Sequence, residues 1–536
     1  SARTGIRLNG PIPQWVREDG GEAGLHPSNI HDNAYAVGTL DLTGDQSILL
    51  GPDGPSLGGF VCSVTTAKGE MWKLGQLHPG DKVHFRLLDL DQAKEIREAE
   101  EANLRHEYKE VVLPEQKDLD YHYAILAEET AAGTKIVARL DGEDNILVEY
   151  GEMELDIAIR FRVHVLMQEL KKKDLPVIDL TPGIRSLQIH FDIGKISLKE
   201  MLAAVLETNR TLPELSDVTV PSRIIWLPLS WDDPQTQLAA KRYQQTVRPN
   251  APWCPSNPEF IRRINGLDSI EDVKKIVFDA DYLVLGLGDV YLGAPVATPV
   301  DPRHRMVTTK YNPARPWTPE NAVGIGGAYL CVYGMEGPGG YQFVGRTIQM
   351  WNPLKETEYF KHGKPWLLDF FDQIRFYPVS AEEILKDRED FLRGRFKIKI
   401  EETSFNLGKY EQFLKEHEDT IRAFKDHQEA SFEAERKMWK EKGLDEFDSE
   451  TQDAPAIVEE TVPDGCEAAR TNIPGSVWKV LVEDGQKVRE GDTLVILESM
   501  KMEFPVTAEY SGIIEKVYLK PGEQVNSGQL AASIRV

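Results

Sequence analysis

Cysteine is scarce in this sequence, and no stretch is apolar for long enough to anchor the chain in a membrane. The four cysteines, Cys62, Cys254, Cys331 and Cys466, lie far apart, so neither a disulfide framework nor a zinc site is predicted. Runs of about 18 apolar residues are missing, which argues against a transmembrane helix. The opening stretch SARTGIRLNG has no initiator methionine and no apolar core, so no secretion signal is predicted. We therefore expect reduced, buried thiols and a cytoplasmic protein.

Positive charge is also in short supply. Lysine and arginine together number 62 against 87 aspartates and glutamates, which gives a formal net charge of -25. A chain this acidic repels nucleic acid and anionic lipid, so neither is expected as a partner. Motifs for nucleotide binding are missing too: there is no GxxxxGK[ST] loop and no glycine-rich loop of the ATP-grasp type. ATP-dependent chemistry is therefore not expected on this chain.

The 536 residues are too many for one hydrophobic core, so several domains are expected. Residues 35–90 hold short β-like runs that end in turn signals and predict a compact β unit. Residues 91–110 are densely charged and predict a solvated helix. Strands and helices mix over 145–230, where Ser197 and Glu200 form a capping box at the start of a helix. Glycine-rich β sequence returns over 277–350.

Two further segments differ from the rest. Over residues 405–442 aromatic and aliphatic side chains recur at helical spacing with dense charge between them, which predicts one or two amphipathic helices with a packing face. The apolar positions are Tyr410, Phe413, Leu414, Ile421, Phe424, Phe432 and Trp439. Residues 445–465 are acidic, contain proline and carry few aromatics, which predicts a flexible linker and a domain boundary.

The C-terminal segment is an internal repeat with an offset of 37 residues. The matched pairs are Gly475 with Gly512, Lys479 with Lys516, Val480 with Val517, Gly485 with Gly522, Val488 with Val525 and Gly491 with Gly528. Two such halves predict a small, flattened β-sandwich with pseudo-twofold symmetry. The stretch ESMKME between them is expected to be a joining hairpin with Lys501 at its exposed tip.

A lone turn lysine is most simply a solvated residue, but here the repeat, the hairpin and the flanking methionines coincide. Residues 466–536 resemble the biotin carboxyl carrier domain of biotin-dependent carboxylases, with Glu498, Ser499, Met500, Lys501 and Met502 matching the attachment motif. Lipoyl domains share this fold, but their lysine is usually not flanked by methionine on both sides. The resemblance implies biotin bound covalently to Lys501, carried on a flexible linker.

Four more stretches resemble the carboxyltransferase region of the urea carboxylase family. Residues 21–38 and 51–62 resemble its KipA-like half, and residues 282–305 and 323–347 its KipI-like half. The resemblance implies a multidomain, mainly β fold with α/β parts and cyclophilin-like β-barrel subdomains. We expect the KipA-like part over 1–130, N-terminally incomplete, the KipI-like part over 131–400, helices over 401–444, a linker over 445–465 and the carrier over 466–536.

That family implies carboxyl transfer from carboxybiotin on Lys501 to a nitrogen of urea, giving allophanate. ATP, bicarbonate and Mg²⁺ would be used only by a biotin carboxylase, a domain or subunit expected outside this chain. A biotin protein ligase, and in some cases an allophanate hydrolase, are the other expected partners. Two alternatives stay open: the same machinery acting on guanidine or another amide, and a biotinylated carrier fragment without catalytic activity.

The substrate requires acceptors for its NH2 groups and a donor for its oxygen. Asn29, in HPSN, offers both and suits neutral urea, whereas a carboxylate there would suit guanidinium; a turn or helix cap is the plainer reading. His26 and Arg346 are weaker binding candidates, and Arg346 could equally form a surface ion pair. In all three cases the assignment is a prediction from residue type and resemblance.

Asp289, in GLGDVYLG, lies among glycines that allow close backbone approach and is the first catalytic candidate, although an Asx turn would also explain it. Tyr291 and His304 are weaker catalytic candidates, since a lone histidine is more often structural. The stretch GPDGPSLGG, residues 51–59, has no lysine or helix pattern after it and predicts a tight turn, or a loop on which biotin could lie. No cluster has metal-ligand spacing, so a metal-free site is predicted.

Overall fold

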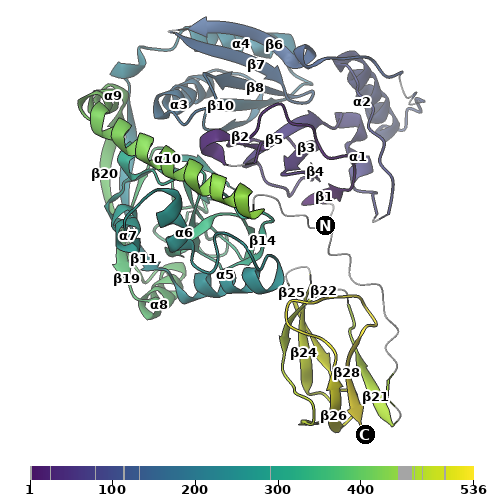
Figure 1. Cartoon of the computed structure of the whole chain (residues 1–536). Coiled ribbons are helices and arrows are strands. Elements are labelled where there is room, and N and C mark those ends of the chain that lie inside the picture. The colour runs from purple at the N-terminus through teal and green to yellow at the C-terminus, as the bar shows by residue number, and fades with distance from the viewer. Residues whose placement is uncertain are drawn as a thin grey trace.

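The computed structural model describes residues 3–24, 26–78, 80–110, 112, 115–131, 133–289, 291–361, 363–444, 462–463, 465–473, 475–499 and 502–536. Three β-based units form the main body, and a fourth, all-β unit lies beside it at the C-terminal end (Figure 1). Within the described part of the chain, no helix is both long and apolar enough to cross a membrane. The multidomain, mainly β architecture predicted from the sequence is confirmed.

The first unit is the N-terminal sheet, which has the strand order β1-β4-β3-β5-β2. Its strands are β1 (Gly5–Leu8), β2 (Asn29–Ala34), β3 (Thr39–Thr43), β4 (Gln46–Leu50) and β5 (Leu57–Thr65). A helix, α2 (Leu90–Leu104), follows, and Asp89 and Gln92 form a capping box at its start. Only its alanines and Ile96 are buried, which confirms the solvated helix expected over this segment.

The second unit is the middle sheet, ordered β6-β7-β8-β10-β9, which packs against two helices. The strands are β6 (Ile125–Ala131), β7 (Thr134–Leu140), β8 (Asn145–Tyr150), β9 (Val177–Pro182) and β10 (Ser186–Phe191), and the helices are α3 (Ile157–Lys171) and α4 (Leu198–Arg210). Ser197 and Glu200 exchange hydrogen bonds at the start of α4, so the predicted capping box is present. The predicted boundary between residues 130 and 131 lies within β6.

The third unit is the barrel. Strands follow the order β18-β15-β16-β13-β12-β19-β11, and β18 pairs in turn with β11, so the sheet closes. The strands are β11 (Thr219–Trp231), β12 (Tyr282–Leu287), β13 (Pro295–Pro299), β15 (Ala322–Gly326), β16 (Tyr329–Val332), β18 (Gln342–Arg346) and β19 (Gln373–Val379). Closure leaves no free edge among these strands and confirms the predicted barrel. β20 (Lys399–Asn406) pairs along the outside of β11.

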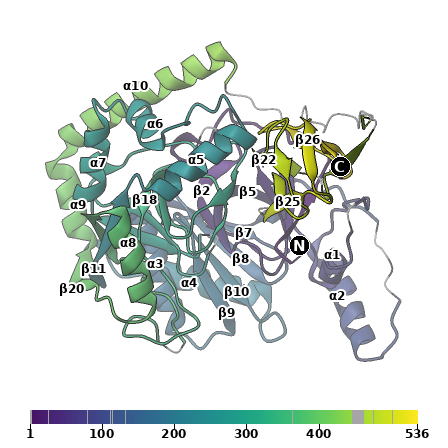
Figure 2. The same ribbon diagram turned by 90° about the horizontal axis from the view of Figure 1, so that it is seen from below.

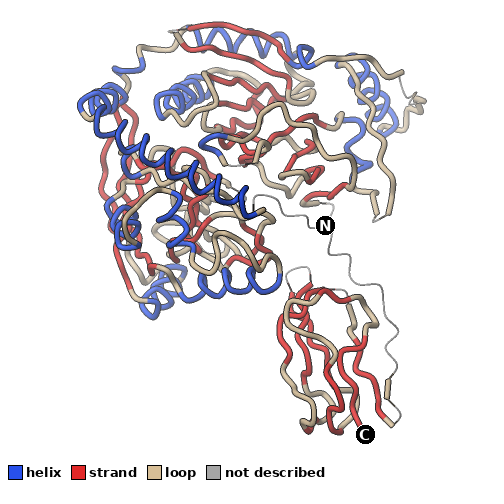
Figure 3. Tube along the Cα trace, in the orientation of Figure 1, coloured by secondary structure: helices blue, strands red, loops and turns tan. Residues whose placement is uncertain are grey.

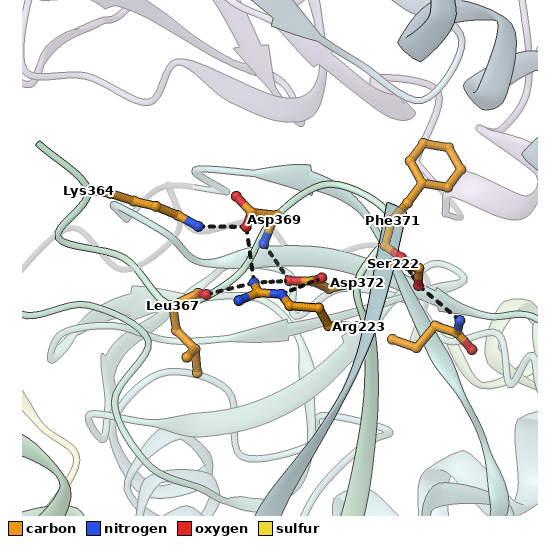
Figure 4. A network of polar contacts seen from close by, with 8 residues as sticks. Ser222, Arg223, Lys364, Leu367, Asp369, Phe371 and Asp372 are labelled. Atoms are coloured by element: carbon orange, nitrogen blue, oxygen red, sulfur yellow. Dashed lines mark hydrogen bonds and ion pairs between the residues drawn. The ribbon is translucent and has the colours of Figure 1, made fainter. Parts of the chain in front are cut away.

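An ion-pair network fastens the loop before β19 to β11 (Figure 4). The Arg223 guanidinium donates to both carboxylate oxygens of Asp372, at 3.0 and 2.5 Å, and lies 3.1 Å from Asp369. Lys364 holds Asp369 from the other side at 2.6 Å. The buried Phe371 lies between Asp369 and Asp372 in the chain and has a φ of 69°. Its carbonyl accepts a hydrogen bond from the Ser222 hydroxyl. The network thus supports a backbone conformation that a bulky residue rarely adopts.

Six helices pack on or around the barrel: α5 (Pro234–Thr246), α6 (Asn257–Ile264), α7 (Ile270–Asp279), α8 (Ala381–Leu392), α9 (Leu407–Glu416) and α10 (Glu418–Lys442). Trp439 of α10 stacks on Phe260 with ring centroids 5.9 Å apart, which confirms the packing face predicted there. Helix α10 crosses the boundary between the barrel and the N-terminal unit on the outside of the molecule (Figures 1 and 2), and its Arg436 donates to Asp19 at 2.7 Å. It therefore links the two units.

The fourth unit is the C-terminal sandwich of two four-stranded sheets, β21-β28-β26-β23 and β25-β24-β22-β27. Its described residues form strands and loops alone (Figure 3). The strands are β21 (Cys466–Arg470), β22 (Gly475–Val480), β23 (Lys487–Val488), β24 (Thr493–Ser499), β25 (Met502–Thr507), β26 (Gly512–Val517), β27 (Gln524–Val525) and β28 (Leu530–Arg535). A shift of 37 residues converts β22, β23 and β24 into β26, β27 and β28, so the repeat relates one sheet to the other.

Matching turns explain the repeated glycines of the sandwich. Gly485 and Gly522 have φ of 84° and 89°, and Gly491 and Gly528 have φ of 89° and 85°. Only glycine adopts this conformation readily, so the same turn recurs in both halves. The predicted acidic linker over 445–465 lies outside the described residues except at positions 462, 463 and 465.

Candidate active site

The N-terminal sheet meets the barrel along two contacts that join residues far apart in the chain. Leu57 of β5 forms a parallel bridge with Asp289, which follows β12. In the neighbouring edge strand β2, His31 Nδ1 lies 2.5 Å from the hydroxyl of Tyr329 in β16. Both side chains of this second pair are buried. The junction therefore brings polar residues of β2 against the barrel strands that carry the sequence-predicted Asp289.

Asp32 and Lys310 meet over Gly59 at this junction. A Cβ atom placed on Gly59 would lie 2.7 Å from Asp32 Oδ1, 2.9 Å from Lys310 Nζ and 2.8 Å from the carbonyl oxygen of Ile30. A side chain at position 59 would therefore displace the carboxylate and the ammonium group. This close approach explains why a glycine occupies position 59 within a strand, where glycine is otherwise unfavourable.

Asp32 is almost fully buried, and its Oδ2 has no hydrogen-bond partner within the described residues. Burial raises the pKa of Asp32 to about 7, with a further rise from the charge of Asp289, while the positive charge of Lys310 opposes the shift. An aspartate in this environment is protonated for part of the time at neutral pH. It can therefore hold or release a proton during a reaction.

Asp289 is the second buried carboxyl of the cluster. Burial raises its pKa, and the charge of Lys310 together with hydrogen bonds to the side chains of Cys331 and Tyr341 opposes the rise. Asp32 and Asp289 influence each other, so the two carboxyls titrate as a pair. With one lysine facing two acids, the cluster favours a state in which the pair keeps one proton.

Lys310 stands between aromatic rings. Its ammonium nitrogen lies 4.7 Å from the ring centroid of Phe60 and 5.6 Å from that of Tyr341. Ring faces attract the cation and exclude water from it. The half-buried lysine also lowers the pKa of Asp41, which burial raises to about 6. A fixed positive charge in such a place is suited to stabilise negative charge that develops on a bound oxygen.

Asn29 and His26, the sequence-predicted binding residues, lie on the approach to β2. Asn29 pairs with Phe60 across the sheet and donates from Nδ2 to the carbonyl of His26 at 2.9 Å. Its amide is thereby oriented, and its Oδ1 accepts no hydrogen bond from the described residues. His26 is half-buried, with Nδ1 2.8 Å from Ser28 Oγ, and burial lowers its pKa. Asn29 is thus paired across the sheet with Phe60, whose ring lies beside Lys310, and His26 is joined to the sheet through Asn29.

The remaining predictions fall in different places. Tyr291 lies next to the cluster, with its ring centroid 6.4 Å from that of Tyr333, and burial raises its pKa to about 12. His304 lines a small gap beside Tyr282 and Pro299. Tyr282 begins β12, whereas Asp289 follows the end of that strand, and five strand residues span about 17 Å. This position does not bring His304 to the Asp32–Asp289 cluster.

Arg346 is also remote from the cluster. It ends β18, whereas Tyr341 precedes that strand, so the two are separated by the strand's length. Its Nε donates to the carbonyl of Glu320 at 2.8 Å, and burial lowers its pKa. In this position the guanidinium supports the loop before β15 rather than the carboxyl pair.

Lys501 and Met500 lie outside the described residues. The strands on either side are described: β24 ends at Ser499, β25 begins at Met502, and these two residues are paired in register. The pairing of β24 with β25 confirms the predicted hairpin, while the position of Lys501 in it stays a prediction.

Sequence reasoning missed Asp32, His31 and Lys310. One signal was available, because the strand-like NIHDNAYAV carries a histidine and an aspartate next to each other in an otherwise β-forming run. Lys310, in TTKYNPARPW, shows no comparable pattern. Its role depends on the neighbours that folding supplies.

Three family models match the chain. Residues 1–87 match the carboxyltransferase domain, subdomain A and B, and residues 136–360 match the carboxyltransferase domain, subdomain C and D. Residues 461–534 match the model of a biotin-requiring enzyme. The cluster of Asp32, Asp289 and Lys310 thus lies where the two carboxyltransferase segments meet.

Relatives align with the whole chain. The urea amidolyase of Lachancea kluyveri is 39% identical over 544 residues, covering 100% of this chain and 30% of that protein. The urea amidolyase of Saccharomyces cerevisiae is 37% identical over 549 residues, covering 100% of this chain and 29% of that protein. The crystal structure of Kluyveromyces lactis urea carboxylase superposes with a TM-score of 0.83 at 38% identity, covering 99% of this chain and 47% of that one. The chain therefore spans less than half the length of these proteins.

Proposed function

Because the chain belongs to the urea amidolyase and urea carboxylase family, as its carboxyltransferase and biotin-carrier portion, we propose that it transfers a carboxyl group from a biotinylated lysine to a nitrogen of urea, yielding allophanate. The observation that carries the proposal is the buried group of Asp32, Asp289 and Lys310 where the N-terminal sheet joins the barrel.

The cluster offers the polar groups that urea requires. Urea presents two NH2 groups, which need acceptors, and a carbonyl oxygen, which needs a donor or a cation. Asp32 Oδ2 and the Asn29 Oδ1 are acceptors left unused by the described residues, and Lys310 supplies the positive charge. The three side chains come from β2 and from the barrel, so the substrate would bind across the junction.

The carboxyl pair provides for proton transfer. As the new bond between an NH2 nitrogen and the carboxyl carbon forms, the bond from that carbon to a biotin nitrogen would break. An ionised carboxylate of the pair would accept the proton that the NH2 group loses and return it to the biotin nitrogen left behind. The other carboxyl, kept neutral by burial, avoids placing two negative charges side by side. Lys310 stabilises negative charge on oxygen during the same step.

Biotin fits the C-terminal sandwich, because the repeat joins its halves through a hairpin whose strands end at Ser499 and Met502. Lys501 is the proposed attachment residue, through an amide between the biotin carboxyl group and its side-chain nitrogen Nζ. When bound, biotin supplies the activated carboxyl group as an N-carboxylated ring. The chain's own residues contribute the binding of urea and the movement of its proton.

The proposal is tested by the biotinylated 536-residue chain with a separately added biotin carboxylase, ATP, bicarbonate and urea. We expect urea-dependent allophanate formation that falls by at least about 100-fold in Asp289→Asn. Asp369→Asn, which changes an exposed carboxylate of the barrel, is the matched control and should keep activity. Carboxylated biotin without urea-dependent turnover in the unaltered chain would favour the non-catalytic carrier instead.

Guanidine is the second candidate substrate, and the two buried carboxyls favour it because a guanidinium forms strong bidentate pairs with a carboxylate. Asn29 favours urea, since its neutral amide gives no such pair. A panel of urea and guanidine, run on the unaltered chain and on Asn29→Asp, separates the two. We expect urea to be preferred and Asn29→Asp to shift the preference towards guanidine; a preference for guanidine in the unaltered chain would contradict the proposal.

The proposed partners follow from the same chemistry. A biotin carboxylase domain or subunit would load the carrier, a biotin protein ligase would modify Lys501, and an allophanate hydrolase would consume the product. The cysteines Cys62, Cys254, Cys331 and Cys466 are free thiols, which supports a reducing compartment such as the cytoplasm. Intact mass after co-expression with a ligase, for the unaltered chain and Lys501→Ala, tests the modification directly.

A further inference from the structure

The C-terminal sandwich touches the barrel at helix α5. Arg242 of α5 places its guanidinium carbon 4.3 Å from the ring centroid of Trp478, a residue of β22 in the sandwich. The same carbon lies 5.0 Å from the ring centroid of Trp317, in β14 (Arg315–Thr318). Figures 1 and 2 both show the sandwich beside one end of α5. One cation thus lies close to an aromatic ring of each unit.

Trp478 lies close to the hairpin proposed to carry biotin. In β22, Ser476 pairs with Glu498 and Val477 with Leu497 of β24, the strand that ends at Ser499. Trp478 itself is 7% exposed. A contact at this point restrains the hairpin more closely than a contact at the far end of the sandwich would.

The ring of Trp317 belongs to strand β14, which also contacts residues next to the cluster of Asp32, Asp289 and Lys310. In the same strand as Trp317, Arg315 is fully buried and donates to the carbonyl of Tyr341 at 2.7 Å. The Tyr341 side chain lies beside Asp289 and lowers the pKa of that carboxyl. Strand β14 therefore lies between the cation of α5 and the residues that surround the carboxyl pair.

A second close approach is specific to one half of the repeat. A Cβ on Gly522 would lie 2.6 Å from the carbonyl oxygen of Gln245 in α5. At Gly485, the equivalent turn of the other half, an added Cβ would meet nothing within 4 Å. The two halves share one fold, so only the position of the sandwich against α5 distinguishes these glycines.

We propose that Arg242 is a positioning residue that holds the sandwich against the barrel, by binding Trp478 while it rests on Trp317, so that the carrier hairpin faces the acid cluster. The purpose of this arrangement rests on the proposed function, and its geometry rests on the contacts of Arg242 with the two rings and of Gly522 with Gln245. A cation over a ring gives an attraction that is modest and reversible, which suits a carrier that must also leave.

Hydrogen exchange of the full biotinylated chain tests the contact without any activity. In Arg242→Ala we expect exchange to rise in residues 475–480, roughly 2- to 30-fold, the range for a lost cation–π contact. Lys241→Ala, an exposed neighbour on α5, is the matched control and should not change exchange there. Unaltered protection of residues 475–480 in Arg242→Ala would overturn the proposal.

Two carboxyl donors, the tethered carrier and free carboxybiotin, distinguish a positioning role of Arg242 from a purely structural one. With the tethered carrier, carboxyl transfer should fall in Arg242→Ala, while with free carboxybiotin as the donor it should change by less than about 2-fold. An equal loss with both donors would mean that Arg242 only supports Trp317 and the barrel. If the unaltered chain showed no urea-dependent turnover at all, the proposed function would fail while the exchange result still decided the contact.

A glycine pair gives a second, independent test that leaves Arg242 intact. Gly522→Ala and Gly485→Ala impose the same backbone strain, because both residues have positive φ. Only Gly522→Ala should also push the sandwich away from α5, raise exchange in residues 475–480 and lower transfer from the tethered carrier. Equal effects of the two substitutions would contradict the docked arrangement.

Discussion

His31 Nδ1 lies 2.5 Å from the hydroxyl of Tyr329, although 298 positions separate the two residues in the chain. Their rings also meet edge to face, with centroids 5.8 Å apart. The pair joins β2 to the barrel directly beside Asp32. The distance between Asp32 and Asp289 therefore depends on how firmly the N-terminal sheet is held against the barrel.

Tyr329→Phe should weaken this junction. Loss of the hydroxyl removes the buried contact with His31 Nδ1, which costs about 1 kcal/mol of unfolding free energy. Tyr282→Phe is the matched control, because the Tyr282 hydroxyl is buried in the same barrel and has no partner within the described residues. Calorimetric melting should show a lower Tm for Tyr329→Phe only; equal melting of both variants would contradict a role for the contact.

Stability should depend on pH through Asp32. Burial raises the folded-state pKa of Asp32 to about 7, whereas the unfolded chain has the ordinary value near 4. The folded protein then binds the proton more tightly, so this contribution to stability is complete below about pH 4 and is lost as the pH rises to about 7. Relative to Asp32→Asn, the Tm of the unaltered chain should fall across this window. A difference in Tm that stays constant from pH 4 to pH 8 would show that Asp32 is not perturbed.

Lys310→Met should both slow transfer and move its pH dependence. The charge of Lys310 opposes the raised pKa of Asp32, Asp289 and Asp41, so its removal raises all three further. We expect a loss of about 100-fold in kcat and an acidic limb of the rate profile that shifts to higher pH. Lys364→Met removes a lysine that pairs with the partly exposed Asp369 and should change neither. An unshifted limb would exclude the proposed charge coupling.

Gly59→Ala should disturb the site by steric crowding alone. Its Cβ would come within 3 Å of Asp32 Oδ1, Lys310 Nζ and the carbonyl of Ile30, and the backbone oxygen cannot move aside easily. A displacement of about 1 Å costs roughly 100-fold in rate. Gly10→Ala, where the new Cβ meets nothing within 4 Å, is the control. Retained carboxyl transfer in Gly59→Ala would show that Asp32 and Lys310 do not act in the reaction.

The amino-acid sequence by itself determined the parts of this protein that are local. The C-terminal repeat shows as a fixed 37-residue offset, because each half needs the same strands and the same glycine turns at Gly485 and Gly522. The capping box of Ser197 and the aromatic face of α10 are likewise encoded within a few turns of chain. Asp289 could be singled out because a charged residue stood among glycines.

Tertiary structure alone decided which polar residues work together. Asp32 and Lys310 are separated by more than half the length of the chain and meet only because the N-terminal sheet packs on the barrel. Their charges matter because burial removes the water that would screen them. His304 and Arg346 were weaker candidates by residue type, and a strand's length separates each of them from the cluster. Residue type suggests chemistry, but distance and burial select the residues that can perform it.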